Sequence, residues 1–186
     1  MSQRDSGYAR RERDLYETPE WVTEALIPHL PSIRDRRVWE PACGSGKMAA
    51  VLRRHARLVD ASDIDANHGE MTEDFLSWRR AIIGVSAIIT NPPYELAAEF
   101  CEHALRLMEP ERGVVAMLLR TDFDHAKSRA HLFRDCPAFA KKVVLTRRIV
   151  WFEPEPGAKG KSPSFNHAWY VWDWQHDGPP TIGYAP

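Results

Sequence analysis

The chain has 186 residues, of which 44% are hydrophobic and 27% charged, as is typical of a single globular domain with a substantial core. Its net charge of −1 gives no general excess of positive charge of the kind that nucleic-acid-binding proteins usually show. The three cysteines are widely separated, which excludes a disulfide framework or a Cys-x-x-Cys metal pair, and we expect no metal. Without an apolar signal or membrane segment, the sequence predicts a cytoplasmic protein.

The N-terminal part divides into an arm and the start of a domain. The first 14 residues are polar and lack periodicity, which predicts a flexible arm before a single domain over residues 15–186. Thr18-Pro19-Glu20 predicts the beginning of a helix, with Thr18 as the N-cap and Pro19 at the first helical position.

From residue 37 onward, strand-like segments alternate with helical ones. The run Ala87-Ile88-Ile89 is typical of a strand covered on both faces. Leu96, Phe100 and Ala104 recur at the spacing of an amphipathic helix. This alternation predicts a doubly wound sheet with helices on both faces. In chain order, we expect a strand over 37–40, a helix over 46–55, a strand over 58–64, a partly helical stretch over 68–79, a strand over 81–90, a helix over 96–108, a strand over 113–119 and a helix over 125–135.

The last part of the chain has a different pattern. Residues 143–151 and 167–174 are strand-like and are separated by a loop rich in proline and glycine, with no helix between them. Because a parallel pair needs a longer crossover, the two runs should form an antiparallel hairpin. We therefore expect a mostly parallel sheet with a C-terminal antiparallel hairpin.

A glycine-containing loop, Glu40-Pro41-Ala42-Cys43-Gly44-Ser45-Gly46, follows the first predicted strand. A loop that binds nucleoside triphosphates is excluded, because Pro41 replaces its first glycine and Met48 its Ser or Thr. The pattern Gly44-x-Gly46-x-x-Ala49, with Asp63 about twenty residues further on, matches a dinucleotide fingerprint. An acid at that position accepts hydrogen bonds from ribose hydroxyls. The loop therefore indicates a bound nucleoside, without distinguishing a nicotinamide cofactor from S-adenosylmethionine.

The tetrapeptide Asn91-Pro92-Pro93-Tyr94 follows a buried strand, at the sheet edge where open α/β proteins bind ligands. The Asn91 side-chain oxygen and the Pro92 carbonyl can accept both N–H bonds of a planar amino group. Proline fixes the loop and removes a competing amide hydrogen, and Tyr94 offers a flat face for stacking. We predict these four residues as the catalytic set, although a Pro-Pro turn could also simply end the strand.

Five segments resemble the motifs of class I S-adenosylmethionine-dependent methyltransferases, especially the adenine amino-methyltransferases. The glycine loop is similar to their first motif and the tetrapeptide to their Asn-Pro-Pro-Tyr motif. Asp63-Ile64-Asp65 resembles the second motif and Glu73-Asp74-Phe75 the third. Tyr16-Glu17-Thr18-Pro19 looks like the N-terminal motif, and its place at the start resembles the gamma-type motif order.

The resemblance implies a Rossmann-like methyltransferase fold with a mostly parallel, seven-stranded sheet, and S-adenosylmethionine as the cofactor. It implies that Glu40 lies near the methionine end, Asp63 at the ribose and Ile64 against the adenine ring. Asp74 would bind the adenine amino group, with Phe75 packed nearby. The cofactor-binding residues expected in this way are Thr18, Pro19, Glu40, Pro41, Ala42, Gly44, Gly46, Asp63, Ile64, Asp74, Phe75 and Asn91.

We expect the substrate to be the N6 amino group of adenine in DNA. A base in duplex DNA must leave the stack to react, and its pocket then needs two flat faces. Tyr94 supplies one, and the resemblance puts a second aromatic residue near Phe152, our first choice, or Trp151; either could instead be a core residue. Lys159 and Lys161 in the following loop could contact phosphates, or belong to a mobile hairpin loop.

Other acceptors remain open, namely adenine in RNA and the amide of a protein glutamine, because enzymes acting on glutamine also use Asn-Pro-Pro-Tyr. A non-catalytic module that only binds nucleic acid is a further alternative, against which the presence of Asn91 and Asp63 speaks. Gamma-type enzymes usually carry a separate target-recognition domain after the catalytic one. Only about a dozen residues follow the last predicted strand, so we expect weak sequence specificity or a partner chain that supplies it.

Overall fold

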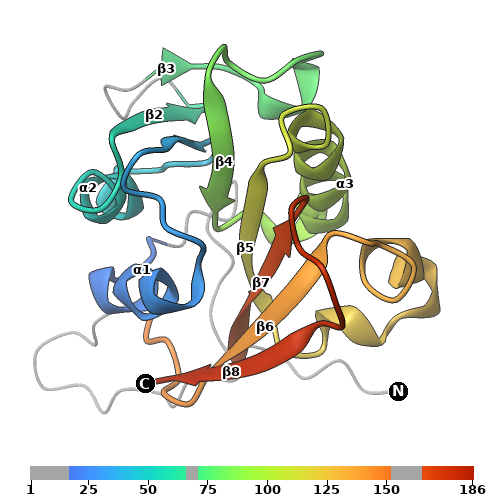
Figure 1. Cartoon of the computed structure of the whole chain (residues 1–186). Helices are drawn as coiled ribbons and strands as arrows, with labels where there is room; N and C mark the ends of the chain where they lie inside the picture. Colours follow the sequence, from blue (N-terminus) through green and yellow to red (C-terminus); the bar gives the residue numbers. More distant parts are fainter. Residues whose placement is uncertain (1–16, 66–70, 152–164) are drawn as a thin grey trace, which may run out of the picture.

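The structure is a computed structural model that describes residues 17–65, 71–151 and 165–186; the predicted arm over 1–14 lies outside these ranges. One sheet of eight strands forms the centre of the described part (Figure 1). The strands are β1 Arg37–Glu40, β2 Leu58–Asp63, β3 Met71–Thr72, β4 Val85–Thr90, β5 Val114–Arg120, β6 Phe139–Leu145, β7 His167–Asp173 and β8 Thr181–Ala185. Their order in the sheet is β3-β2-β1-β4-β5-β7-β6-β8.

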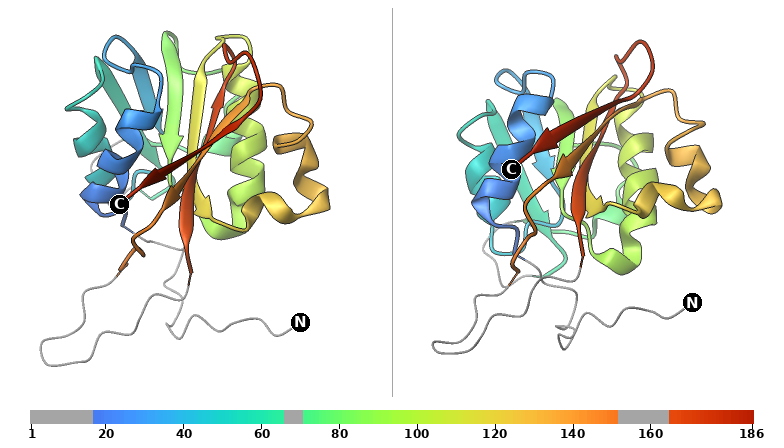
Figure 2. Two further views of the ribbon diagram at one scale, coloured as in Figure 1. Left: turned by 60° about the horizontal axis from the view of Figure 1, so that its bottom comes forward. Right: turned by 90° about the horizontal axis from the view of Figure 1, so that it is seen from below.

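Helices cover both faces of this sheet (Figures 1 and 2). The α-helices are α1 Glu20–Leu26, α2 Lys47–Leu52 and α3 Ala97–Met108, and the 3-10 helices are η2 Ile27–His29, η4 Phe75–Ser77, η5 Tyr94–Leu96, η6 Phe123–His125 and η7 Lys127–Leu132. Within the described ranges, none of the helices has the length and apolar character needed to cross a membrane.

Alternate residues of the central strands point into two separate apolar layers. Val38 and Ile89 pack on one face with residues of α1 and α2. Trp39 and Ile88 pack on the other face with the buried side of α3. All four side chains are fully buried, which explains why these strands are apolar without alternation in the sequence.

The sheet combines parallel and antiparallel pairing. Strand β1 pairs in parallel with β2 and β4, and β4 pairs in parallel with β5. Strand β7 is antiparallel to both β5 and β6, so the predicted C-terminal hairpin is confirmed. The count of seven strands is wrong. The eighth strand, β8, pairs in parallel with β6 at the edge of the sheet (Figure 2).

The predicted strand over 143–151 is shifted. Strand β6 covers 139–145 instead. Its first half contains two lysines that hide its strand character, and both ammonium groups have partners in the protein. The Lys141 Nζ donates to the carbonyl oxygen of His29 at 3.3 Å, and the Lys142 Nζ lies 2.7 Å from an Asp124 carboxylate oxygen.

Two helical predictions are confirmed only in part, because the helices are short and of the 3-10 type. The stretch 125–135 forms the short 3-10 helices η6 and η7 rather than an α-helix. Only Leu132 of these two elements is buried, so there is no continuous apolar face to stabilise a longer helix. The stretch 68–79, of which residues 71–79 are described, contains β3 and the single turn η4.

Thr18 does not cap helix α1 as predicted. The N-cap residue is Pro19, and no side chain makes a capping hydrogen bond there. The Thr18 hydroxyl accepts a hydrogen bond from the Asn91 side chain instead. This long-range partner lies beyond what a local capping pattern can predict.

Candidate active site

A pocket lies at the carboxyl ends of β1, β2 and β4, where the strand order reverses between β1 and β4. Open α/β sheets bind ligands at such a reversal. Each of the three strands contributes a polar residue to the pocket: Glu40 ends β1, Asp63 ends β2, and Asn91 directly follows β4. The sheet topology therefore brings together residues up to 51 positions apart in the chain.

Most of the residues that the motifs single out for the cofactor line this pocket. Those that do are Thr18, Glu40, Pro41, Ala42, Gly44, Asp63, Ile64, Asp74, Phe75 and Asn91. Pro19 and Gly46 do not. The pocket wall also contains residues that the sequence did not assign to the cofactor, namely Glu17, Cys43, Ser45, Lys47, Met48, Asp65, Glu73, Pro93, Leu96 and Phe100. Leu96 and Phe100 carried only the helical periodicity of a core element, which gave no signal for a site.

The glycine loop is held against the end of β2 by hydrogen bonds from its backbone amides to the Ser62 carbonyl and the Asp63 side chain. Gly44 and Gly46 have φ values of 52° and 81°, in the left-handed region that glycine adopts most readily. The Gly44 amide donates to Oδ2 of Asp63 at 2.8 Å, and the Asp65 amide donates to its Oδ1 at 3.0 Å. These bonds fix the Asp63 carboxylate, and each of its oxygens has a second lone pair with which to accept from a ligand.

The pocket has an acidic residue at its base and an ion pair at its rim. Glu40 is only 1% exposed, yet lines the pocket, so its carboxylate can meet a cationic or hydrogen-bond-donating ligand group. Glu17 and Lys47 form an ion pair of 2.6 Å, with both side chains partly exposed. This pair ties the segment before α1 to the first turn of α2.

The Asn91 side chain has a defined orientation. Its Nδ2 donates to the Thr18 hydroxyl at 3.2 Å, and Thr18 is buried. Because Nδ2 points toward Thr18, Oδ1 points away from Thr18 within the plane of the amide. Within the tetrapeptide, Asn91 and Pro93 line the pocket, whereas Pro92 and Tyr94 do not.

Tyr94 contacts a residue that the sequence prediction missed. Its hydroxyl and Nε2 of His167 are joined by a hydrogen bond of 2.8 Å. Trp151 meets the His167 ring edge-on, with the centroids 5.2 Å apart. Burial, together with the positive charge of Arg120, lowers the pKa of His167 to about 4, and the nearby Asp122 opposes this shift. In the sequence, His167 is only the first residue of a predicted strand, so no local pattern marks it.

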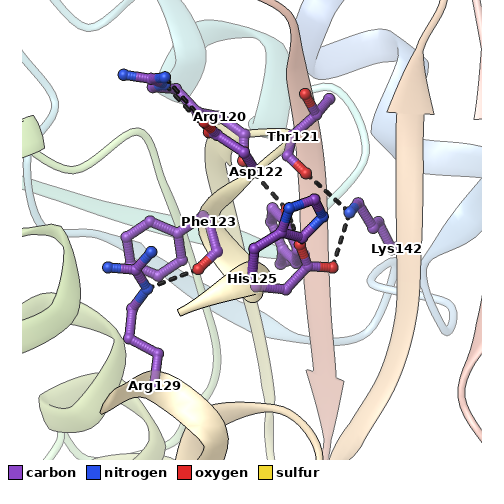
Figure 3. Close-up of polar contacts among 9 residues, drawn as sticks. Arg120, Thr121, Asp122, Phe123, His125, Arg129 and Lys142 are labelled. Carbon is purple, nitrogen blue, oxygen red and sulfur yellow. Dashed lines mark hydrogen bonds and ion pairs between the residues drawn. The ribbon is translucent and has the colours of Figure 1, made fainter. Parts of the chain in front are cut away.

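Strand β5 ends at Arg120, which lies opposite His167 in the sheet. Charged side chains at this end of β5 are paired within the protein (Figure 3). Arg120 forms an ion pair with Asp122 at 2.9 Å. The Lys142 Nζ donates to the Thr121 carbonyl at 2.9 Å and also pairs with Asp124. These contacts hold the segment after β5 against the sheet.

Three of the predicted substrate-binding residues, Phe152, Lys159 and Lys161, lie outside the described residues. Trp151 is described and lies beside His167. In the part of the chain that the structure describes, no group of three or more His, Cys, Asp or Glu side chains is arranged to hold a metal ion.

No protein-family model and no curated protein matches the sequence, but solved structures match the fold. A type I restriction-modification methyltransferase subunit from Streptococcus thermophilus has a TM-score of 0.63 at 11% identity, over 89% of this chain and 45% of that one. A putative RNA methyltransferase from Pyrococcus horikoshii has a TM-score of 0.59 at 17% identity, over 87% of both chains. An S-adenosylmethionine-dependent O-methyltransferase from Thermotoga maritima has a TM-score of 0.56 at 14% identity, over 84% of this chain and 66% of that one.

These similarities show that the chain has the Rossmann-like fold that these methyltransferases share. The chain spans less than half the length of the Streptococcus protein. The three proteins are described as acting in different contexts, one of them on RNA and one on an oxygen atom. Because the same fold occurs in proteins with different acceptors, the fold does not identify the methyl acceptor. The residues of the site have to identify it.

Proposed function

We propose that this chain transfers a methyl group from S-adenosylmethionine to the N6 amino group of adenine in DNA. The observation that carries the proposal is the position of Asn91. It follows β4, lines the same pocket as Glu40 and Asp63, and has its amide oriented by Thr18. One pocket thus combines residues suited to the cofactor with an acceptor suited to an amino group.

The cofactor would lie across the ends of β1 and β2. Asp63 is fixed by two backbone amides and suits the ribose hydroxyls. Buried Glu40 suits the ammonium group of the methionine part, and exposed Ile64 offers an apolar surface to the adenine ring. The cofactor supplies a methyl group on a positively charged sulfur, whose charge is neutralised as the methyl leaves.

The target nitrogen would be held by Asn91 and Pro92. An amino group on a heteroaromatic ring is a poor nucleophile, because its lone pair is delocalised into the ring. Two acceptors, Oδ1 of Asn91 and the Pro92 carbonyl, would take its two N–H bonds and favour a lone pair directed at the methyl group. Positioning and local electrostatics then provide most of the rate enhancement.

A nucleic-acid base is favoured over a protein amide by the aromatic residues near the tetrapeptide. Tyr94 and Trp151 both contact His167, which gathers flat side chains of the kind that hold an extruded base. The similar Streptococcus protein is a restriction-modification subunit, which also favours DNA and a partner chain for sequence recognition. Adenine in RNA and a protein glutamine amide present the same two hydrogens and are the alternative acceptors.

The Asn91→Ala variant tests the role of the pocket. It should lose methyl transfer by at least about a hundredfold, the typical cost of removing one preorganised polar group from an active site, while S-adenosylmethionine still binds. The measurements are tritiated methyl transfer and calorimetric cofactor titration. Gln175→Ala is a matched control, because it removes an exposed amide that donates to the Arg112 carbonyl away from the pocket. Full activity in Asn91→Ala would contradict the proposal.

A further inference from the structure

The first residue of β7, His167, is buried although it is polar. It is 3% exposed, and among the described residues its Nδ1 has no hydrogen-bond partner. An apolar side chain could fill this position without burying an unsatisfied nitrogen. The hydrogen bond from its other nitrogen, Nε2, to the Tyr94 hydroxyl is therefore the contact that distinguishes histidine from an apolar residue here.

The two partners come from distant parts of the chain. Tyr94 begins the short helix η5, directly after the proline pair, whereas His167 lies in the sheet opposite Arg120 of β5. The two rings do not stack closely, since their centroids are 6.2 Å apart at an angle of 37°. The hydroxyl therefore ties the outer end of a partly exposed tyrosine to the rigid sheet.

The imidazole is itself held in place. Trp151 packs edge-on against it at 83°, and the backbone of β7 is paired on both sides, with β5 and β6. Since the pKa of His167 is lowered to about 4 by burial, the ring is neutral at pH 7. A neutral ring can share one hydrogen with the tyrosine hydroxyl in either tautomer.

We propose that His167 is a positioning residue that acts through Tyr94, fixing the tyrosine ring over the methyl-accepting amino group. The proposal rests on the proposed function, in which Tyr94 stacks on the target. A fixed ring loses less conformational freedom when the target base arrives, so the base is bound more tightly. His167 itself touches neither the cofactor nor the target.

A double-mutant cycle tests whether His167 acts through Tyr94. His167→Leu and Tyr94→Phe each remove the hydrogen bond, and each should raise the KM for the nucleic-acid substrate roughly two- to tenfold, the range expected for one hydrogen bond. The double variant should be no worse than either single one, and His167→Gln, which can still bond to a hydroxyl, should recover part of the loss. Cofactor affinity should stay unchanged. Independent, multiplicative effects would overturn the proposal.

The hydrogen bond between His167 and Tyr94 can also be measured independently of methyl transfer. In nitrogen-15 NMR spectra, the Nε2 resonance of His167 should shift when Tyr94 becomes Phe, whatever the acceptor substrate is. An unchanged resonance would overturn the proposal even for an active enzyme. Failure of the wild-type chain to methylate any acceptor would instead overturn the proposed function, while the spectrum still shows whether the pair exists.

Discussion

Thr18 lines the candidate pocket and also orients Asn91. Its hydroxyl accepts a hydrogen bond from Nδ2 of Asn91. An asparagine amide has two chemically different ends, and only its oxygen can accept a bond from an amino group. With Nδ2 bonded to Thr18, the Asn91 oxygen is turned away from Thr18, as the proposed methyl transfer to nitrogen requires.

Thr18→Val should therefore lower kcat more than it lowers cofactor affinity. It keeps the side-chain volume but leaves the Asn91 Nδ2 without this acceptor, at a cost of about 1–3 kcal/mol. Thr18→Ser is the matched control, because it retains the hydroxyl and should retain most of the activity. Steady-state kinetics and a cofactor titration check this, and equal activity of the valine and serine variants would argue against the role.

His167 also makes stability depend on pH. Its pKa is about 4 in the folded protein, below the ordinary value of 6.5, so between these values the unfolded chain binds more protons. The contribution of His167 to the free energy of unfolding should therefore fall by up to about 3 kcal/mol as the pH drops from about 6.5 to 4. Above pH 6.5 this contribution should stay constant. Urea unfolding at pH 7 and 4.5 measures this. His167→Gln should lose less stability between the two pH values than the wild type, and an equal loss would contradict the assignment.

At the scale of elements, the loop between β1 and α2 depends on glycine conformation. Gly44 has a φ of 52° and its amide binds Asp63. A Cβ atom in this conformation costs about 1–2 kcal/mol and adds a methyl group beside the pocket. Gly44→Ala should therefore weaken cofactor binding as well as stability.

Gly84 offers a matched control for that variant. It also has a positive φ, of 79°, and a Cβ atom there would meet nothing within 4 Å. Gly84→Ala should lose comparable stability while binding the cofactor normally. Calorimetric titration and thermal unfolding of both variants distinguish the effects, and equal cofactor affinities would show that the loop does not contact the ligand.

The elements that the sequence predicted well are those with strong local signals. The apolar run of β4 and the periodicity of α3 are formed by neighbouring residues of one segment, most of which are buried. Strand β6 was misplaced because Lys141 and Lys142 pair with groups distant in sequence. Strand β8 was missed because Ile182 and Tyr184 are exposed, leaving no buried alternation to recognise.

At the scale of the whole molecule, the candidate site was partly predictable because the sheet topology is. Once strands and helices alternate, the ends of β1, β2 and β4 must meet at one edge, which brings Glu40, Asp63 and Asn91 together. The contacts across that edge could not be predicted. The bonds from Thr18 to Asn91 and from Tyr94 to His167 each join residues 73 positions apart, and no local pattern encodes such pairs.

The central claim is methyl transfer to an adenine amino group in DNA. Its most direct test is incubation of the chain with tritiated S-adenosylmethionine and, in parallel, DNA, RNA and protein, followed by digestion and identification of the methylated product. We expect label in DNA, recovered as N6-methyladenine. Label only in RNA or in protein glutamine would reassign the acceptor, and label on an oxygen atom, or no label at all, would contradict the account.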